Sequence, residues 1–211
     1  MDTVKYLGVL IDKDLKWKNH IDKISNTISR NIGLIKKSSF FLEREHLLLL
    51  YNSLCLPYLN YCCLIWGQTF PTILSRLLIL QKKVVRIIDG QHRLAHTKPI
   101  FLKYKILKVK DIAAVQTITL MHNIITHNAP AIISRLFLLT ELGPRATRNI
   151  KHFKEPFSGK LYGTRTLPWL APRLWNSIIT PFFQEIENVP QSKHIIKKFT
   201  KDHIFATYTN D

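Results

Sequence analysis

The sequence predicts a mostly α-helical protein with one short β-hairpin at its N-terminus. Two observations lead to this fold class. Apolar residues recur every three or four positions in several long segments, which is the period of amphipathic helices. Only residues 4–12 (VKYLGVLID) have the β-branched and aromatic character of a strand, and no run of comparable length follows within the next hundred residues.

The hairpin is expected over residues 4–17. Its strand runs into Asp12-Lys13-Asp14, a polar sequence that is typical of a turn. Leu15 and Trp17 can then return as a short second strand. Because an unpaired apolar strand edge invites pairing, this strand could also add to a sheet of another chain.

A helical bundle is expected over residues 18–90. Ile21, Ile24 and Ile28 begin an apolar stripe that continues at the same spacing to residue 35. Pro57 should interrupt the second helical region, and Asp89-Gly90 is typical of a helix end. We expect helices at about residues 18–37, 43–54, 57–66 and 73–88.

Residues 91–211 are expected to form a looser C-terminal region of helices and loops. Its segments 91–108 and 142–190 should be irregular, the first basic and the second rich in proline. Further helices are expected at about residues 111–126, 130–137 and 192–205, with Ser192 as an N-cap. The predicted domains are the hairpin (1–17), the bundle (18–90) and the C-terminal region (91–211).

The charge of the chain indicates a polyanionic partner. Lysine and arginine number 31 against 14 acidic residues, which gives a net charge of +17 with histidine neutral. The excess occurs in all parts of the chain rather than in a tail, so the folded body itself is basic. Nucleic acid is the expected partner of such a body, and a contribution to solubility alone is the alternative.

Two features bear on the compartment. Residues 47–75 carry no charge, but Pro57, Asn60 and Gly67 interrupt them, so we expect two buried helical segments rather than a membrane span. The N-terminus lacks the order of a signal peptide, and the three cysteines fit a reducing compartment. We therefore expect an intracellular protein of the nucleus or cytoplasm that is not secreted.

No metal site or catalytic group is expected. Cys62-Cys63 and the later pair His92 and His96 suggest zinc, but adjacent cysteines in a helix point about 100° apart, so buried thiols are the preferred interpretation. Metal-assisted phosphoryl transfer needs converging carboxylates. Asp12 and Asp14 merely flank a lysine in a turn, and no Asp-Asp pair occurs.

Three blocks resemble a known family. They are VKYLGVLIDKDLKWKNHIDKISNTISRNIGLI, LLLLYNSLCLPYLNYCCLIWG and LLILQKKVVRII. In this order and spacing they resemble the reverse transcriptase (RNA-directed DNA polymerase) of non-LTR retrotransposons, the jockey-like, LINE-type mobile elements. The resemblance is strong over residues 4–90 and looser beyond, through HTKPIF, GTRTLP, APRLWNSI and SKHIIKKF.

The resemblance implies a thumb and C-terminal region alone. In that family KYLGV lies in the primer-grip hairpin after the palm, and the paired catalytic aspartates lie upstream of it. The implied chain is thus a fragment that binds RNA–DNA or single-stranded nucleic acid without polymerising. Divalent metal would belong to the missing palm, which another chain could supply as a partner. The implied primer-grip residues are Lys5, Tyr6, Leu7 and Gly8.

Cations on the polar faces of the thumb helices are the predicted phosphate contacts. They are Arg30, Lys36, Lys37, Lys82, Lys83 and Arg86. Nearby aromatic residues could stack on bases, but their apolar surroundings favour the core. These aromatic residues are Trp17, Tyr51, Tyr58, Tyr61 and Trp66. Two alternatives remain open, a helical protein-interaction scaffold and a degenerate gene product without activity.

Overall fold

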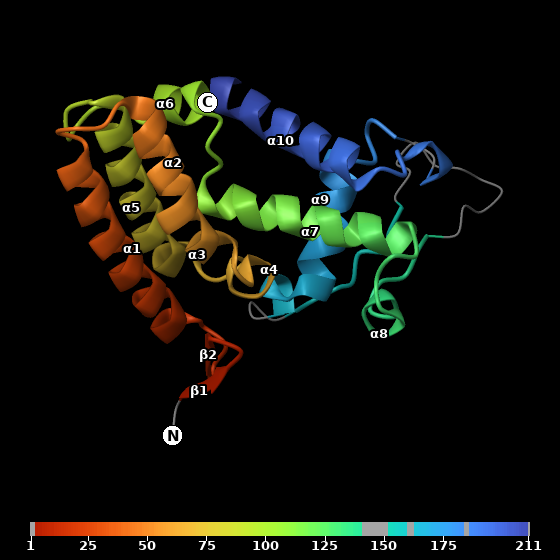
Figure 1. Cartoon of the computed structure of the whole chain (residues 1–211). Coiled ribbons are helices and arrows are strands. Elements are labelled where there is room, and N and C mark those ends of the chain that lie inside the picture. Colours follow the sequence, from red (N-terminus) through yellow and green to blue (C-terminus); the bar gives the residue numbers. More distant parts are fainter. Residues whose placement is uncertain (1–2, 141–151, 160–162, 184–185, 211) are drawn as a thin grey trace. The chain divides into compact units, whose positions relative to one another are not determined.

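The computed structural model describes residues 3–140, 152–159, 163–183 and 186–210 (Figure 1). Helices dominate these ranges, and the only sheet within them is a two-stranded hairpin, so the mostly α-helical fold class is confirmed. The chain divides into two compact units, Met1–Ala113 and Ala114–Asp211. The domain boundaries expected after residues 17 and 90 stay predictions.

The hairpin consists of β1 (Thr3–Tyr6) and β2 (Val9–Asp12). Tyr6 pairs with Val9, so Leu7 and Gly8 alone make the turn, with φ of 44° and 84°. Positive φ at both positions is what a type I′ turn requires. The expected hairpin is therefore present, but residues 4–12 make both of its strands rather than one.

The turn predicted at residues 12–14 is present, because the Leu15 N–H donates to the Asp12 carbonyl oxygen at 3.0 Å, but the predicted return strand after it is wrong. Leu15 and Trp17, the expected return strand, have φ of 50° and 61°, which lies outside the β region. Trp17 is instead the residue before the first helix. The single glycine inside the strand pattern of residues 4–12 was the sequence signal for the turn of the hairpin.

The helices predicted for the bundle are confirmed, with a change in the second region. There the helix predicted for residues 57–66 is split in two at Cys62, whose φ is 50°. A further short helix lies within residues 91–108, which were expected to be irregular, because Ile100 and Phe101 are buried there. The helices are α1 (Lys18–Ser38), α2 (Arg44–Leu54), α3 (Leu56–Asn60), α4 (Cys63–Trp66), α5 (Pro71–Asp89) and α6 (Lys98–Lys103).

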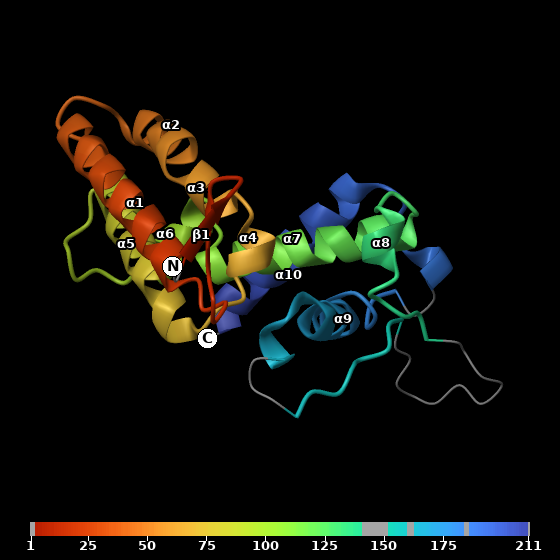
Figure 2. The same cartoon turned by 90° about the horizontal axis from the view of Figure 1, so that it is seen from below.

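The core of the first unit lies between α1, α2 and α5. Figures 1 and 2 both show α1 beside α5, and these two helices pack most extensively. Each presents its apolar stripe inward, as Ile28 of α1, Tyr51 of α2 and Leu77 of α5 illustrate with exposures of 1% or less. The end of α5 is fixed by Gly90, whose φ of 69° terminates the helix as predicted.

The second unit has its own core around Trp175 and Phe153, both fully buried. Helix α7 (Val109–Ile125) begins in the first unit and ends in this one. Residues 167–178 are helical although they were expected to be loop, and residues 141–151 of that expected loop lie outside the described ranges. The other elements are α8 (Ala131–Ser134), η1 (Gly163–Arg165), α9 (Leu167–Ile178), η2 (Ile186–Asn188) and α10 (Lys193–Asn210).

Candidate nucleic-acid interface

The turn of the hairpin is fixed to the helices of the first unit by two side chains. The Tyr61 hydroxyl donates to the Leu7 carbonyl oxygen at 2.6 Å, and the Lys23 ammonium donates to the Gly8 carbonyl oxygen at 3.4 Å. Val9, directly after the turn, is 5% exposed. Two of the predicted grip residues, Leu7 and Gly8, are therefore brought against α1 and the end of α3.

The other two predicted grip residues, Lys5 and Tyr6, lie on β1 with exposed side chains. A glycine in a primer grip would let the backbone approach a primer. The φ of 84° at Gly8 shows a more immediate requirement, which is the turn itself. The primer-grip assignment stays a prediction.

A pocket of about 320 Å³ opens between the turn, α1 and α3. The turn contributes Gly8, while α1 contributes His20 and Lys23 among others. Tyr58 and Tyr61 form part of the opposite wall and are half exposed. The pocket thus combines aromatic surface with one cation at its edge.

A stripe of exposed cations runs along α1 from this pocket. Lys23, Arg30 and Lys37 are spaced by seven residues, so they lie on one face of the helix. The Arg30 guanidinium donates to the hydroxyl of Thr27, which lines the pocket, at 3.4 Å. We call Lys23, Arg30 and Lys37 the α1 stripe. Lys36, also predicted as a phosphate contact, is exposed but lies one position off this line.

Lys23 was missed by the prediction from sequence. Its signal was available, because it stands seven residues before Arg30 and hence on the same face of an expected helix. What the sequence could not show is that this lysine reaches the hairpin turn.

The cations of α5 have different surroundings from those of α1. Lys83 is exposed and Lys82 is partly buried. The Arg86 guanidinium donates through Nε to the Ala95 carbonyl oxygen at 2.8 Å, and through Nη1 to that of Lys82 at 3.4 Å. Arg86 therefore holds the segment after α5 in place.

The aromatic residues divide between core and surface. Tyr51 and Trp66 are 1% and 0% exposed, which confirms the core interpretation for these two. Tyr58 and Tyr61 are 43% and 52% exposed, so these two remain available for stacking.

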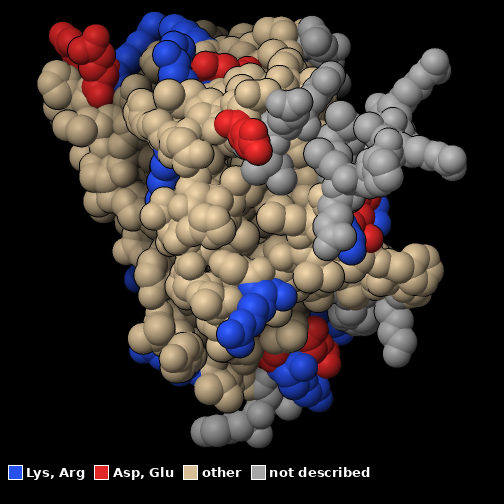
Figure 3. All heavy atoms as spheres, turned by 90° about the vertical axis from the view of Figure 1, so that its right-hand side faces the viewer, with Lys and Arg blue, Asp and Glu red and all other residues tan. Residues whose placement is uncertain are grey.

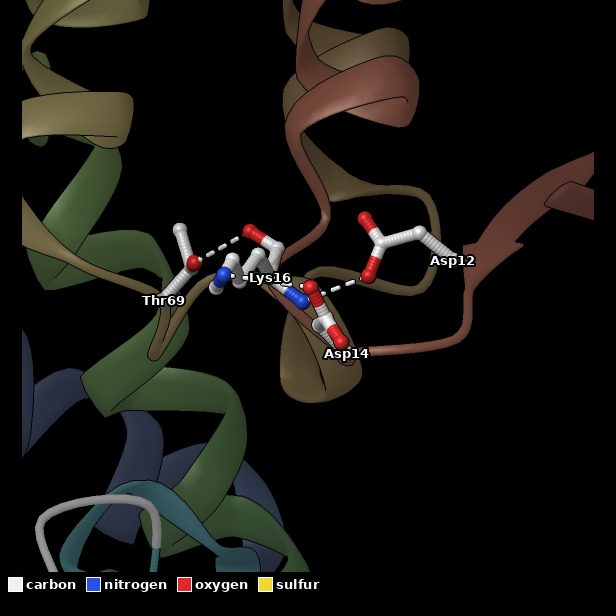
Figure 4. A network of polar contacts seen from close by, with 4 residues as sticks. All are labelled: Asp12, Asp14, Lys16 and Thr69. Carbon is white, nitrogen blue, oxygen red and sulfur yellow. Dashed lines mark hydrogen bonds and ion pairs between the residues drawn. The ribbon is translucent and has the colours of Figure 1, made fainter. Parts of the chain in front are cut away.

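Two closely spaced acids serve the start of α1 (Figure 4). Asp12 accepts the Lys16 backbone N–H at 2.7 Å, and Asp14 pairs with the Lys16 ammonium at 3.1 Å. The Lys16 carbonyl oxygen in turn accepts the Thr69 hydroxyl at 2.7 Å. This network ties the linker before α1 to the segment before α5.

Asp89, at the end of α5, is buried with two donors. The Lys103 ammonium lies 2.6 Å and the Tyr104 hydroxyl 2.8 Å from its Oδ1, and Arg44 approaches to 4.0 Å. The hydrogen bond from Lys103 is the main cause that lowers the pKa of this carboxyl group. Asp89 therefore joins α5 to the residues around α6.

The cysteines behave as core residues. Burial raises the pKa of the Cys55 and Cys63 thiols to about 12, so both are neutral at pH 7. Among the residues that the structure describes, no group of three or more histidine, cysteine or acidic side chains could hold a metal ion. Within the same residues, no helix is long and apolar enough to cross a membrane.

The second unit carries basic residues beyond the predicted phosphate contacts. On α10 they repeat at helical spacing, as Lys193, Lys197 and Lys201 show, and the first two are exposed. On the face drawn in Figure 3, charged residues are few and scattered among uncharged ones. In the first unit, the row of cations on α1 leads to the pocket.

Comparison with known proteins supports the resemblance seen in the sequence. The chain is 30% identical over 94 residues to a probable RNA-directed DNA polymerase from transposon X-element of Drosophila melanogaster, covering 42% of this chain and 10% of that protein. It is 29% identical over 112 residues to the RNA-directed DNA polymerases from mobile element jockey of Drosophila funebris and Drosophila melanogaster. These two matches cover 51% of this chain and 12% of each relative.

The chain is therefore a relative of retrotransposon RNA-directed DNA polymerases. It spans about a tenth of the length of the curated relatives it matches. No family model and no solved structure matches it.

Proposed function

We propose that the first unit binds the sugar-phosphate backbone of RNA–DNA or single-stranded nucleic acid along the α1 stripe. One observation carries the proposal. Lys23, Arg30 and Lys37 share one exposed face that begins at the hairpin turn. At a rise of about 1.5 Å per residue the stripe is about 21 Å long, which is enough to follow several phosphates.

The proposal assigns binding to this unit rather than nucleotide incorporation. The carboxylates of Asp12, Asp14 and Asp89 are each engaged by local donors. A palm that carries the catalytic acids and their divalent metal would then be a partner of this unit. Its relatives are named for RNA-directed DNA polymerase activity, so a primer–template duplex is the first substrate to test.

The test is salt-dependent binding of the full chain to a labelled RNA–DNA duplex. The triple variant Lys23→Glu, Arg30→Glu, Lys37→Glu should weaken binding and lower the salt slope by about two to three units, roughly one per lost phosphate contact. The matched control Lys98→Glu, Lys105→Glu, Lys110→Glu has the same net charge and should retain most of the slope. Equal losses in both variants would mean that only net charge matters.

A second candidate, a protein-interaction scaffold, is favoured by one feature. The loop between α1 and α2 exposes Phe40 and Phe41 by 78% and 89%. Large apolar side chains at such exposure are typical of docking surfaces. If this loop binds a second copy of the chain, Phe40→Ser with Phe41→Ser should lower self-association in analytical ultracentrifugation and leave nucleic-acid binding unchanged.

A further inference from the structure

A buried histidine lies in the wall of the pocket beside the hairpin turn. His20 is 3% exposed, and its Nδ1 accepts the backbone N–H of Leu10 at 3.3 Å. The ring stands edge-on to Trp66 at 5.8 Å between centroids. Its Nε2 has no hydrogen-bond partner among the residues that the structure describes.

The free nitrogen of His20 is a donor. Burial, and then the nearby Lys23, lower the pKa of this imidazole, so the ring is neutral at pH 7. Because Nδ1 accepts from Leu10, the single proton of the neutral ring must reside on Nε2. A buried N–H donor without a partner costs free energy, which a ligand atom that accepts its hydrogen bond would recover.

The other walls of the pocket suit a flat, aromatic ligand. Tyr58 and Tyr61 supply half-exposed rings, and Tyr61 is held by its hydroxyl bond to Leu7. The volume of about 320 Å³ exceeds that of a single base. At the edge, Lys23 begins the α1 stripe, so a group in the pocket can belong to a strand whose phosphates continue along α1.

We propose that this pocket takes one unpaired nucleobase of the bound strand, with its ring against Tyr58 and an acceptor atom at Nε2 of His20. The proposal rests on the proposed function, since the phosphates of the same strand would lie on the α1 stripe. It adds a contact that depends on a base being present. Every common base has a ring face and an acceptor atom, so the contact should tolerate base sequence.

The experiment compares two labelled single-stranded DNA oligonucleotides that differ in their bases alone. One is an intact oligothymidylate, and the other has an abasic residue at every second position, so its phosphates are the same. Wild-type full-length chain should bind the intact strand more tightly by about tenfold, as expected for one stacked base. Tyr58→Ala should remove this preference and leave the salt slope unchanged.

The control is Leu49→Ala, which truncates an exposed side chain of α2 outside the pocket and should keep the preference. Equal binding of both strands by wild-type chain would overturn the pocket proposal but leave backbone binding intact. Absence of salt-dependent binding to either strand and to the RNA–DNA duplex would overturn the proposed function, and this inference with it.

His20→Phe tests the donor separately. It keeps an aromatic ring against Trp66 but removes Nε2–H, and should reduce the preference for the intact strand by about fivefold. Its circular dichroism must match wild type, because the variant also removes the acceptor for Leu10. If this variant does not fold, the Tyr58→Ala result alone decides. A folded His20→Phe variant that keeps the full preference would exclude His20 as the donor.

Discussion

Helices α1 and α5 lie side by side in one core and carry similar numbers of positive side chains, yet they use their polar groups differently. On α1, the Arg30 and Lys37 side chains are exposed and make no described bond outside their own helix. On α5, Gln81, Arg86 and Asp89 all bind the segment that follows the helix. The side chains of Arg30 and Lys37 therefore stay at the surface, whereas several polar side chains of α5 hold the following segment in place.

The difference shows that the position of a cation on the polar face of a helix does not by itself define what that cation does. By sequence, Arg30 and Arg86 were equivalent candidates for phosphate contacts. The half-buried Arg86 meets a backbone carbonyl oxygen and fixes a loop, while Arg30 bonds only a neighbouring threonine. Substitutions on α5 should therefore lower the stability of the fold, whereas substitutions on α1 should weaken nucleic-acid binding.

The largest effect is expected at Gln81. This side chain is 1% exposed and bonds the Tyr51 hydroxyl, the Leu107 carbonyl oxygen and the Val109 N–H. Gln81→Leu should lower the free energy of unfolding by about 2–4 kcal/mol, because it leaves buried polar groups unpaired. Urea unfolding followed by circular dichroism measures this, with the exposed Asn26→Leu on α1 as a control expected to change by less than about 0.5 kcal/mol.

Asp89 should give the next largest effect, and one that depends on pH. Its pKa is lowered in the folded protein, so its stabilisation is complete above the unfolded pKa of about 4 and is lost as the pH falls through the folded pKa. Asp89→Asn should cost about 1–2 kcal/mol at pH 7. Unfolding curves at descending pH should show the variant and wild type converging below about pH 4. A difference that is constant with pH would contradict the ionic role.

A smaller difference should separate the two arginines. Arg86→Ala removes the donor to Ala95 and should lower the free energy of unfolding by about 1 kcal/mol. Arg30→Ala should change it by less than about 0.5 kcal/mol, since exposed substitutions rarely do more. Thermal unfolding of both variants checks this, and equal destabilisation would abolish the contrast between α1 and α5.

The smallest effect is expected within α1 itself. Lys37→Glu, on the α1 stripe, should lower the salt slope of nucleic-acid binding by about one unit. Lys36→Glu makes the same charge change one position away, about 100° around the helix, and should alter the slope by less. Fluorescence anisotropy over a range of salt concentrations compares them. Identical slopes would mean that the stripe is not the contact line.

Periodicity predicted α1 and α5, because each buries a regular apolar face, and helices were also expected at α2, α7 and α10. Periodicity missed α9, since Pro168 and Pro172 argue against a helix. Pro168 lies in the first turn, where its missing N–H costs little, and Trp175 anchors the helix by burial and by a bond to His152. Contacts distant in sequence thus override local preference, and a single sequence does not reveal them.

The candidate site was predicted only in part, because it too depends on contacts between residues distant in sequence. The cations and tyrosines were visible as residue types on expected helices, and the resemblance placed a functional hairpin near residue 6. The pocket was not predictable, because it exists only where the turn meets residues of α1 and α3. His20 gave no signal in the sequence, since its significance lies in which of its two nitrogens has a partner.

The bond between Tyr61 and Leu7 joins residues 54 positions apart. Closing so long a loop is entropically unfavourable until the intervening helices have formed, so this contact should form late during folding. Under mild denaturant it should also open early, because Tyr61 and the turn are largely exposed while the helical core is not. Opening of the pocket should then mark local unfolding. Amide hydrogens of the hairpin should exchange before the helical bundle unfolds.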